Sequence, residues 1–398
     1  MQQLLSQRVN ALSESETLKM ARMGRELKAQ GHDVISLSLG EPDFDTPDHI
    51  KDAAYQALKD GYTKYTPVAG LPELTKAISE KFKRENNLDY RPEQIVVSNG
   101  AKQTVYNLCQ ALLNPGDEAI IFAPYWVSYF EIIKMAEATP VCVYAGVERD
   151  FKPTPEQLEA AITPRTKFLL FSSPCNPTGT VFTRDELQAY ADVIARHDNV
   201  LIISDEIYEH INFTHEHVSI GSFPNVKDRT ITINGFAKGF AMTGWRLGYM
   251  GAPTVVADAC TKIQGQVTSG ASSFGQKAGA VALTSDLGPT EKMREAFRER
   301  RDIVLNMLEE IPGIKTNLPD GAFYIFPDIS SFFGKSDGTT TINSADDFCD
   351  YVMTNAYVGL VSGSAFGDPN CFRLSYAASE AQLREAVRRM KEVLGRLK

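Results

Sequence analysis

Several features that direct a chain to a particular class of protein are scarce or missing in this sequence. It has six cysteines among 398 residues, and no two of them form a C-x-x-C pair, so neither a disulfide framework nor a zinc ribbon is indicated. No G-x-G-x-x-G turn follows a predicted strand, which argues against a nicotinamide dehydrogenase. No apolar run approaches the ~18 residues of a membrane span, and the first residues are too polar for a signal peptide.

Basic residues are also in deficit. Lys and Arg number 41 against 50 Asp and Glu, the net charge is −9, and no Lys/Arg cluster occurs. A nucleic-acid-binding protein needs a basic face, so we expect no nucleic-acid partner and no membrane partner. Several cysteines lie in apolar runs, which indicates reduced thiols. We therefore expect a cytoplasmic enzyme, and we expect no metal site.

Apolar strands alternate with helical patterns between residues 94 and 250. We expect strands at 95–98, 118–122, 141–144, 167–171, 200–204, 229–233 and 246–250. A capping box from Thr183 to Glu186 begins a helix that runs to about His197. Buried strands separated by helices predict an α/β fold with a mostly parallel sheet covered on both faces. In such sheets ligands bind beyond the carboxyl ends of the strands.

The pattern changes after about residue 285. A charged helix over 291–310 is followed by expected strands at 321–326, 357–361 and 371–375. Further helices are expected from Ser344 and from the capping box that begins at Ser379. The first residues add a helix over 18–27 and a strand over 34–39. The later region is predicted to be a smaller α+β domain.

One lysine lies in an unusual setting. The β-branched run 231–233 ends at Asn234-Gly235, and Lys238 follows among small and apolar neighbours. Poor solvation lowers the pKa of an amine and makes it a nucleophile; alternatively, the stem lies on apolar surface and the head reaches water. Arg246 follows eight residues later. A lysine that holds an aldehyde and an arginine that holds a phosphate are the parts that a pyridoxal phosphate site needs.

The segment 230–249 resembles the cofactor-binding segment of the class I (fold type I) pyridoxal-phosphate-dependent aminotransferases. The resemblance covers nearly the whole chain and is closest to the bacterial aspartate aminotransferase branch, which also includes prephenate aminotransferases. It implies a large cofactor-binding domain over 46–287, with a seven-stranded sheet, and a small domain made of 1–45 with 288–398. It also implies a homodimer with shared active sites, in which Tyr65 reaches the phosphate of the neighbouring subunit. A loop tyrosine is otherwise an ordinary surface residue.

The phosphate end of the expected site combines a turn with a cation. The segment 98–104 follows a strand and begins a helix, and backbone N–H groups at such a turn suit a phosphate. Taken alone, a Gly after a strand indicates only a tight turn. With Arg246, the resemblance implies a phosphate-binding loop of Gly100, Ala101 and Lys102. Many relatives carry a phosphate-binding Ser three residues before the lysine, where this chain has Gly235.

The ring of the cofactor has four expected neighbours. Trp126, one of only two tryptophans, would stack on the ring, although a core position suits it equally. The resemblance places Asn176, in a turn between two prolines, on the 3′-oxygen, together with Tyr208. Asp205 ends an apolar strand, where a buried carboxylate is costly without a cation, and a protonated ring nitrogen is such a cation. The alternative for Asp205 is a helix N-cap.

The substrate side depends on a second arginine. Arg373 lies in an apolar strand, where a structural carboxylate partner is the usual explanation. In the resembling family this arginine binds the substrate α-carboxylate through a planar fork. The implied substrate-binding set is Gly40, Lys102, Trp126, Asn176 and Arg373. In the bacterial branch, a lysine at the place of Lys102 takes the side-chain carboxylate.

The predicted reaction is a ping-pong transfer of an amino group between L-aspartate and 2-oxoglutarate, an amino acid and a 2-oxo acid, with Lys238, Asp205 and Tyr208 as catalytic residues. Prephenate transfer is the main alternative. Its enzymes carry a basic residue near the N-terminus, where this chain has Ser13 to Thr17 without one, so aspartate is favoured. A lyase on the same fold would keep every cofactor residue. A non-enzymatic regulator would need a DNA-binding extension and would be expected to lack Lys238.

Overall fold

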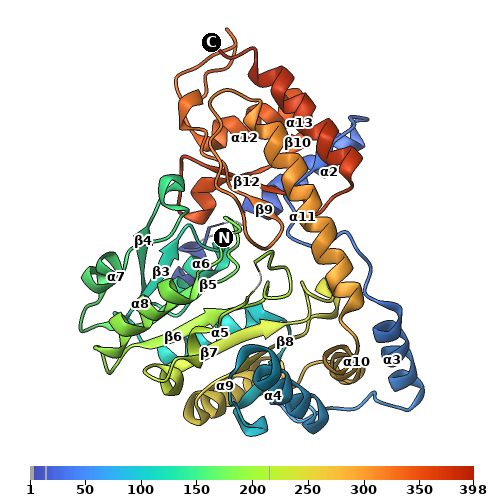
Figure 1. The fold of residues 1–398 in the computed structure, drawn as a ribbon, viewed down its shortest axis with the longest axis vertical. Coiled ribbons are helices and arrows are strands. Elements are labelled where there is room, and N and C mark those ends of the chain that lie inside the picture. The colour runs from blue at the N-terminus through green and yellow to red at the C-terminus, as the bar shows by residue number, and fades with distance from the viewer. Residues whose placement is uncertain (1–3, 14–15, 215) are drawn as a thin grey trace.

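The computed structural model describes residues 4–13, 16–214 and 216–398. Figure 1 shows the seven-stranded sheet in the lower part of the view, with helices on both sides of it, and a smaller body of helices and short strands above. The long helix α11 (Gly288–Glu309) extends from one body to the other. Among the described residues, no helix is long and apolar enough to cross a membrane.

The large sheet has the strand order β2-β8-β7-β6-β5-β3-β4. Its strands are β2 (Ile95–Ser98), β3 (Glu118–Ala123), β4 (Thr139–Tyr144), β5 (Thr166–Ser172), β6 (Leu201–Asp205), β7 (Thr230–Gly235) and β8 (Gly248–Gly251). Within the described chain, β8 is the one strand of this sheet that is antiparallel to its neighbours, and the other pairs are parallel. The mostly parallel seven-stranded sheet is therefore confirmed.

Helices cover both faces of this sheet because successive strand residues point to opposite sides. Ile121, Leu170 and Ile203 pack with α5 (Ala101–Leu112), α6 (Val127–Met135) and α9 (Thr254–Val267). Their neighbours Ile120 and Leu169 pack on the other face with α7 (Pro155–Ala161) and α8 (Arg184–Ala195). Helices α3 (Asp48–Lys59), α4 (Pro72–Asn86) and α10 (Ser273–Thr284) form a further cluster beside β2 and β8.

The smaller body contains a three-stranded antiparallel sheet of β11 (Val361–Ser362), β12 (Phe372–Ser375) and β9 (Tyr324–Ile325). Helices α11, α12 (Ala345–Ala356) and α13 (Glu380–Leu394) pack on it. Strand β1 (Ile35–Ser36), which follows α2 (Glu16–Ala29), pairs with β10 (Val358–Gly359). The N-terminal segment is therefore part of the smaller body, together with the C-terminal residues. The exact domain boundaries, 45/46 and 287/288, stay a prediction.

Several helix starts follow from capping residues. The side chains of Thr183 and Ser379 accept hydrogen bonds from the third residues of α8 and α13, and both capping boxes are complete. Ser344 caps α12 in the same way, without the reciprocal bond of a full box. A cap satisfies backbone N–H groups that the helix itself leaves unpaired, and these starts lie where the sequence predicts them.

Some expected strands are wrong in extent. The strand expected over 34–39 ends at Ser36, because the carbonyl oxygens of Ser38 and Gly40 accept hydrogen bonds from side chains instead. The strand expected over 246–250 begins only at Gly248, since Arg246 has a φ of 53°, in the left-handed region that strands exclude. All six cysteines are free, but Cys142 on β4 is exposed rather than in the core.

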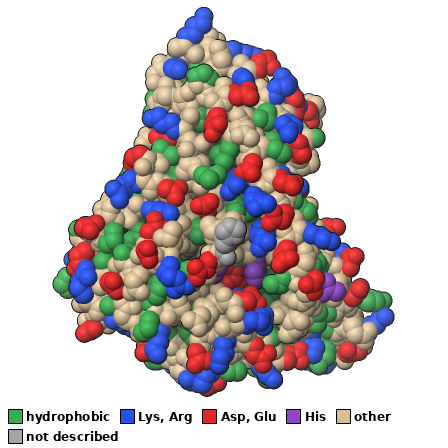
Figure 2. Space-filling view, viewed as in Figure 1, with side chains coloured by type: hydrophobic (Ala, Val, Ile, Leu, Met, Phe, Trp, Pro, Cys, Tyr) green, Lys and Arg blue, Asp and Glu red, His purple; other side chains and the backbone are tan. Residues whose placement is uncertain are grey.

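The surface mixes charges of both signs. On the face drawn in Figure 2, Lys and Arg side chains are interspersed with Asp and Glu side chains, and no large patch of one sign is visible there.

Candidate active site

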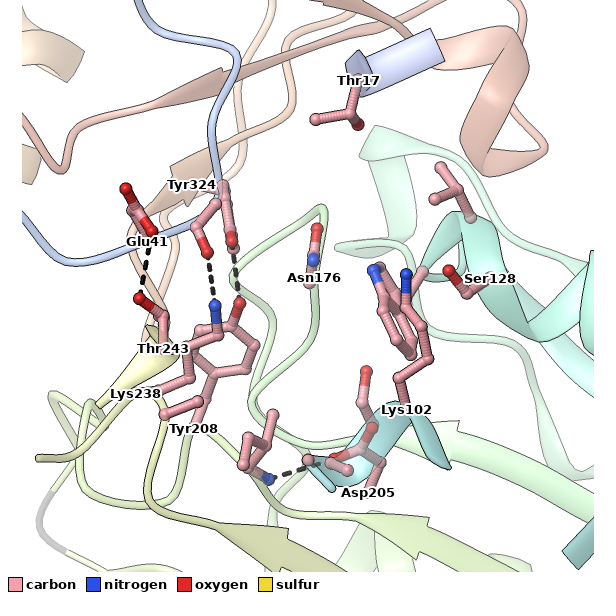
Figure 3. A pocket seen from close by; sticks show the side chains of 18 of the residues that line it. Thr17, Glu41, Lys102, Ser128, Asn176, Asp205, Tyr208, Lys238, Thr243 and Tyr324 are labelled. Atoms are coloured by element: carbon pink, nitrogen blue, oxygen red, sulfur yellow. Dashed lines mark hydrogen bonds between the residues drawn. The ribbon is translucent and has the colours of Figure 1, made fainter. Parts of the chain in front are cut away.

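A cavity of about 450 Å³ opens between the two bodies. Eleven of the predicted site residues line it: Gly40, Gly100, Ala101, Lys102, Trp126, Asn176, Asp205, Tyr208, Lys238, Arg246 and Arg373. Tyr65 does not; its side chain is 98% exposed. Figure 3 shows Lys102, Asn176, Asp205, Tyr208 and Lys238 around this cavity.

Lys238 lies in the loop after β7. Its Nζ donates a hydrogen bond to the carbonyl oxygen of Gly40, and its head therefore faces the cavity rather than bulk water. Burial, reinforced by the charge of Arg373, lowers the pKa of Lys238 to about 8. A substantial share of the amine is then uncharged near neutral pH, as a nucleophile or base requires.

Asp205 ends β6 at the carboxyl edge of the sheet. Tyr129 donates a hydrogen bond to its Oδ2 at 2.6 Å, and the backbone N–H of Ile207 donates to its Oδ1 at 3.2 Å. Burial raises the pKa of Asp205 to about 6, although the bond from Tyr129 lowers it. Among the described residues no lysine or arginine forms an ion pair with Asp205, so the buried carboxylate has hydrogen bonds but no cation. The bond from Ile207 closes a turn, and in the described chain no helix begins directly after β6, so the expected alternative, a helix N-cap, is wrong.

Arg373 lies on β12 and is 3% exposed. It donates hydrogen bonds to Asn176 Oδ1 at 2.9 Å and to the carbonyl oxygen of Ser38 at 2.7 Å. No carboxylate of the described residues lies within ion-pair distance, and its buried Nε has no hydrogen-bond partner. The expected structural alternative, a carboxylate partner, is therefore wrong. A buried guanidinium without an anion is costly, so an anion in the cavity would offset that cost.

The phosphate end of the cavity is built from a helix N-terminus and a guanidinium. Gly100 is the N-cap residue of α5 and has a φ of +85°, which glycine adopts without strain. A Cβ on Gly100 would lie 2.3 Å from Arg246 Nη2. Arg246 itself donates to the carbonyl oxygens of Thr243 and Asn99, at 2.9 and 3.3 Å. In the part of the chain that the structure describes, it forms no ion pair.

Lys102, in the first turn of α5, lies near Trp126, the N-cap residue of α6. Lys102 Nζ is 5.0 Å from the centre of the Trp126 ring. Burial and the charge of Arg246 lower the pKa of Lys102. The turn that presents Asn176 contains two cis peptide bonds, before Pro174 and before Pro177.

Two tyrosines of the site were missed from the sequence. Tyr129 holds Asp205, and the Tyr324 hydroxyl lies 2.8 Å from that of Tyr208. Both occur in apolar stretches, where the sequence alone does not distinguish them from core aromatics. The spacing of Tyr129 three residues after Trp126, on one helix face, was the available signal.

A second group of charged residues lies behind the site. The segment after β6 turns Glu206 and Glu209 away from the cavity, toward Lys81 and His217. Lys81 is fully buried and forms an ion pair with Glu209, and His217 contacts Glu206 at 2.9 Å. Asn86 donates to both carboxylates, at 3.2 and 2.7 Å. These carboxylates are thus already paired, and they anchor the segment that carries Asp205 and Tyr208.

Comparison with known proteins agrees with this geometry. The family model for aminotransferase class I and II matches residues 32–390. The chain is 49% identical to an aspartate/prephenate aminotransferase from Cereibacter sphaeroides, over 97% of each chain. A solved aspartate aminotransferase from Rhizobium meliloti is 43% identical, with a TM-score of 0.96 and 99% of each chain covered. One from Thermus thermophilus with maleate is also 43% identical, with a TM-score of 0.92 over 98% of this chain and 99% of that one.

The chain belongs to the class I and II aminotransferases. The family implies pyridoxal phosphate as cofactor, and the cavity of this aminotransferase fits it. The amine of Lys238 suits the aldehyde, the guanidinium of Arg246 with the N-terminus of α5 suits the phosphate, and the cation-free Asp205 suits a protonated ring nitrogen. When bound, the cofactor supplies an electron-accepting ring that stabilises negative charge at the substrate Cα.

Proposed function

We propose that this aminotransferase moves the amino group between L-aspartate and 2-oxoglutarate by a ping-pong mechanism. The proposal rests chiefly on Arg373, a buried guanidinium that faces the same cavity as Lys238 and has no carboxylate partner among the described residues. Such a group binds an α-carboxylate through two parallel N–H bonds. Lys102 offers a second cation for a side-chain carboxylate.

The residues divide the work of the reaction. Arg373 orients the substrate so that its Cα–H bond points at Lys238, which raises the effective concentration of the base. The pKa of Lys238 is about 8, so part of its amine is uncharged. This Nζ would accept the proton from the substrate Cα and then donate it to the carbon of the cofactor that carries the amino group. Asp205 holds a proton on the ring nitrogen. Asn176 and Tyr208 are proposed to hold the 3′-oxygen.

Prephenate is the second candidate substrate. The Cereibacter sphaeroides relative is named for both activities, and a bifunctional enzyme of Petunia hybrida is 48% identical over 99% of this chain and 83% of its own. The described residues of the N-terminal segment near the cavity offer Thr17 and Leu18. The lysine that follows them in the chain, Lys19, does not line the cavity and is paired with Glu16 at 3.1 Å. This pairing favours aspartate over a bulkier ring substrate that needs an added cation.

Tyr65 supports a homodimer. Tyr65 is 98% exposed, whereas the other predicted site residues line the cavity. Such an exposed side chain suits a contact with a second subunit, so we propose that two copies share their active sites. A fully active monomer would contradict this. The cytoplasmic location expected from the sequence stays a prediction.

An absorbance spectrum of the purified protein tests the function. We expect a visible band that collapses on adding L-aspartate and returns with 2-oxoglutarate. A band that does not change with aspartate but changes with prephenate or its amino product would identify prephenate, rather than aspartate, as the substrate. No band after adding pyridoxal phosphate would refute the site.

The role of Lys102 needs its own variant. Lys102→Gln should lower kcat/KM for L-aspartate by roughly tenfold or more, because a charge-assisted bond is worth about 1.5–3 kcal/mol. The same variant should leave turnover of L-alanine, which has no side-chain carboxylate, much less affected. Equal losses for both substrates would assign Lys102 to the cofactor alone.

A further inference from the structure

Tyr324 lies where three parts of the proposed site meet. It belongs to β9 of the smaller body, lines the cavity and is fully buried. The register between β9 and β12 pairs Tyr324 with Ser375, two residues from Arg373, so both side chains are held by one sheet. Figure 3 shows its side chain directed at Tyr208.

The ring of Tyr324 supports Arg373. The guanidinium carbon of Arg373 is 4.6 Å from the Tyr324 ring centre and 4.8 Å from that of Phe366. A guanidinium stacked on aromatic rings keeps its charge and its orientation. The hydrogen-bonding edge that is left for a carboxylate is thereby fixed.

The hydroxyl of Tyr324 reaches the other body. Its oxygen lies 2.8 Å from the hydroxyl oxygen of Tyr208, which follows β6 of the large sheet. Space around it is limited, since a Cβ on Gly40 would lie 2.5 Å from the same oxygen. A Gly at position 40 thus leaves room for this contact. The hydroxyl pair joins the substrate arginine on one body to a cofactor-facing tyrosine on the other.

We propose that Tyr324 is a positioning residue whose hydroxyl donates to the oxygen of Tyr208, leaving the Tyr208 proton free to point at the cofactor's 3′-oxygen, while its ring holds Arg373. This inference rests on the proposed function, because the 3′-oxygen belongs to the cofactor. A tyrosine hydroxyl whose oxygen accepts one hydrogen bond becomes a stronger donor in the hydrogen bond that it makes itself. Tyr324 therefore links the carboxylate site to the electronics of the cofactor.

The sign of the effect follows from charge. A donor to the 3′-oxygen stabilises its negative charge, which is greatest in the deprotonated, high-pH form of the holoenzyme, so losing the donor moves the midpoint of the pH-dependent visible band upward. The other charged groups around Tyr208 are Lys238, Arg373 and Asp205, and the test leaves all three in place.

The test compares five variants of the holoenzyme by pH titration of the visible band and by steady-state kinetics. Tyr324→Phe should raise the midpoint by roughly 0.3 pH unit, less than Tyr208→Phe, because it acts through one further hydrogen bond. It should keep KM for L-aspartate within about twofold, since the ring remains. Tyr324→Leu should raise that KM by roughly tenfold by removing the ring.

Tyr376→Phe is the matched control. Tyr376 is equally buried and its backbone N–H donates to the carbonyl oxygen of Phe323, next to Tyr324, but its hydroxyl donates to the Ala322 carbonyl oxygen at 3.1 Å and does not line the cavity. Its midpoint should equal the wild-type value. The double variant Tyr208→Phe/Tyr324→Phe should titrate like Tyr208→Phe alone.

Two results would overturn the inference while keeping the function. One is a wild-type midpoint in Tyr324→Phe; the other is a shift of equal size in Tyr376→Phe, which would indicate a general loss of structure. A wild-type protein with no visible band would instead overturn the proposed function, and the inference with it.

Discussion

The charge state of Lys238 near neutral pH can be predicted in numbers. Burial lowers its pKa from 10.5 to about 8. At pH 7, about one amine in ten is then uncharged, against about one in three thousand for an unperturbed lysine, because each pKa unit is a factor of ten. We expect the rate constant for capture of pyridoxal phosphate by the cofactor-free protein to rise about tenfold per pH unit and to level off above the pKa of Lys238.

Stopped-flow absorbance measures this rate across a pH range that includes the lowered pKa of about 8 and the ordinary lysine pKa of 10.5. After correction for the titration of free pyridoxal phosphate, the midpoint should lie at about 8. Arg373→Leu removes a positive charge that lowers the pKa of Lys238, so its midpoint should move to higher pH. Arg388→Leu removes an exposed arginine on α13 and should change nothing. A wild-type midpoint near the ordinary lysine value would refute the assignment of Lys238 as a desolvated amine.

Three further outcomes are expected. Tyr129→Phe removes a hydrogen bond to the carboxylate of Asp205, worth about 1.5–3 kcal/mol, so pyridoxal phosphate should bind roughly 10–100-fold more weakly in equilibrium dialysis; unchanged affinity would show that the bond is dispensable. Gly100→Ala puts a Cβ 2.3 Å from a guanidinium at a positive φ and should weaken binding of pyridoxal phosphate more than that of pyridoxal in a fluorescence titration. Equal losses would place the damage outside the phosphate loop. Lys81→Met leaves the buried carboxylate of Glu209 without its lysine and should lower the free energy of unfolding in urea by about 3–5 kcal/mol, whereas Lys76→Met, which breaks an exposed pair on the same helix, should cost under about 1 kcal/mol. Similar losses in both would contradict the buried pair.

The sequence predicts the large sheet well because its strands are buried on both faces. Seven apolar, β-branched runs separated by helical patterns correspond to the seven strands, and the capping boxes at Thr183 and Ser379 mark two helix starts. The short strands of the smaller body are less regular. There, two-residue strands such as β1 and β9 depend on partners far along the chain, which a local pattern does not contain.

The same contrast holds for the site. Lys238, Asp205 and Arg373 were found because a charged residue in an apolar run is costly and so needs a reason. Tyr129 and Tyr324 fit an apolar run without cost, and only the meeting of segments distant in the chain shows that their hydroxyl groups contact Asp205 and Tyr208. Arg246 was expected within a strand, but the left-handed turn that carries it depends on its contacts with the Asn99 region.

The antiparallel pairing of β8 with β7 brings together the two ends of the loop that carries Lys238 and Arg246. Lys238 follows β7 and Arg246 precedes β8, and the register pairs Gly235 with Gly248 across these two strands. Both ends of the connecting loop are therefore fixed by the sheet, which limits how far the amine and the guanidinium can move apart. A ligand that contacts both must have its aldehyde and its phosphate within that range. If these two groups hold the aldehyde and the phosphate as proposed, the loop would select the cofactor by size as well as by charge, and analogues with a longer or missing phosphate arm would bind more weakly.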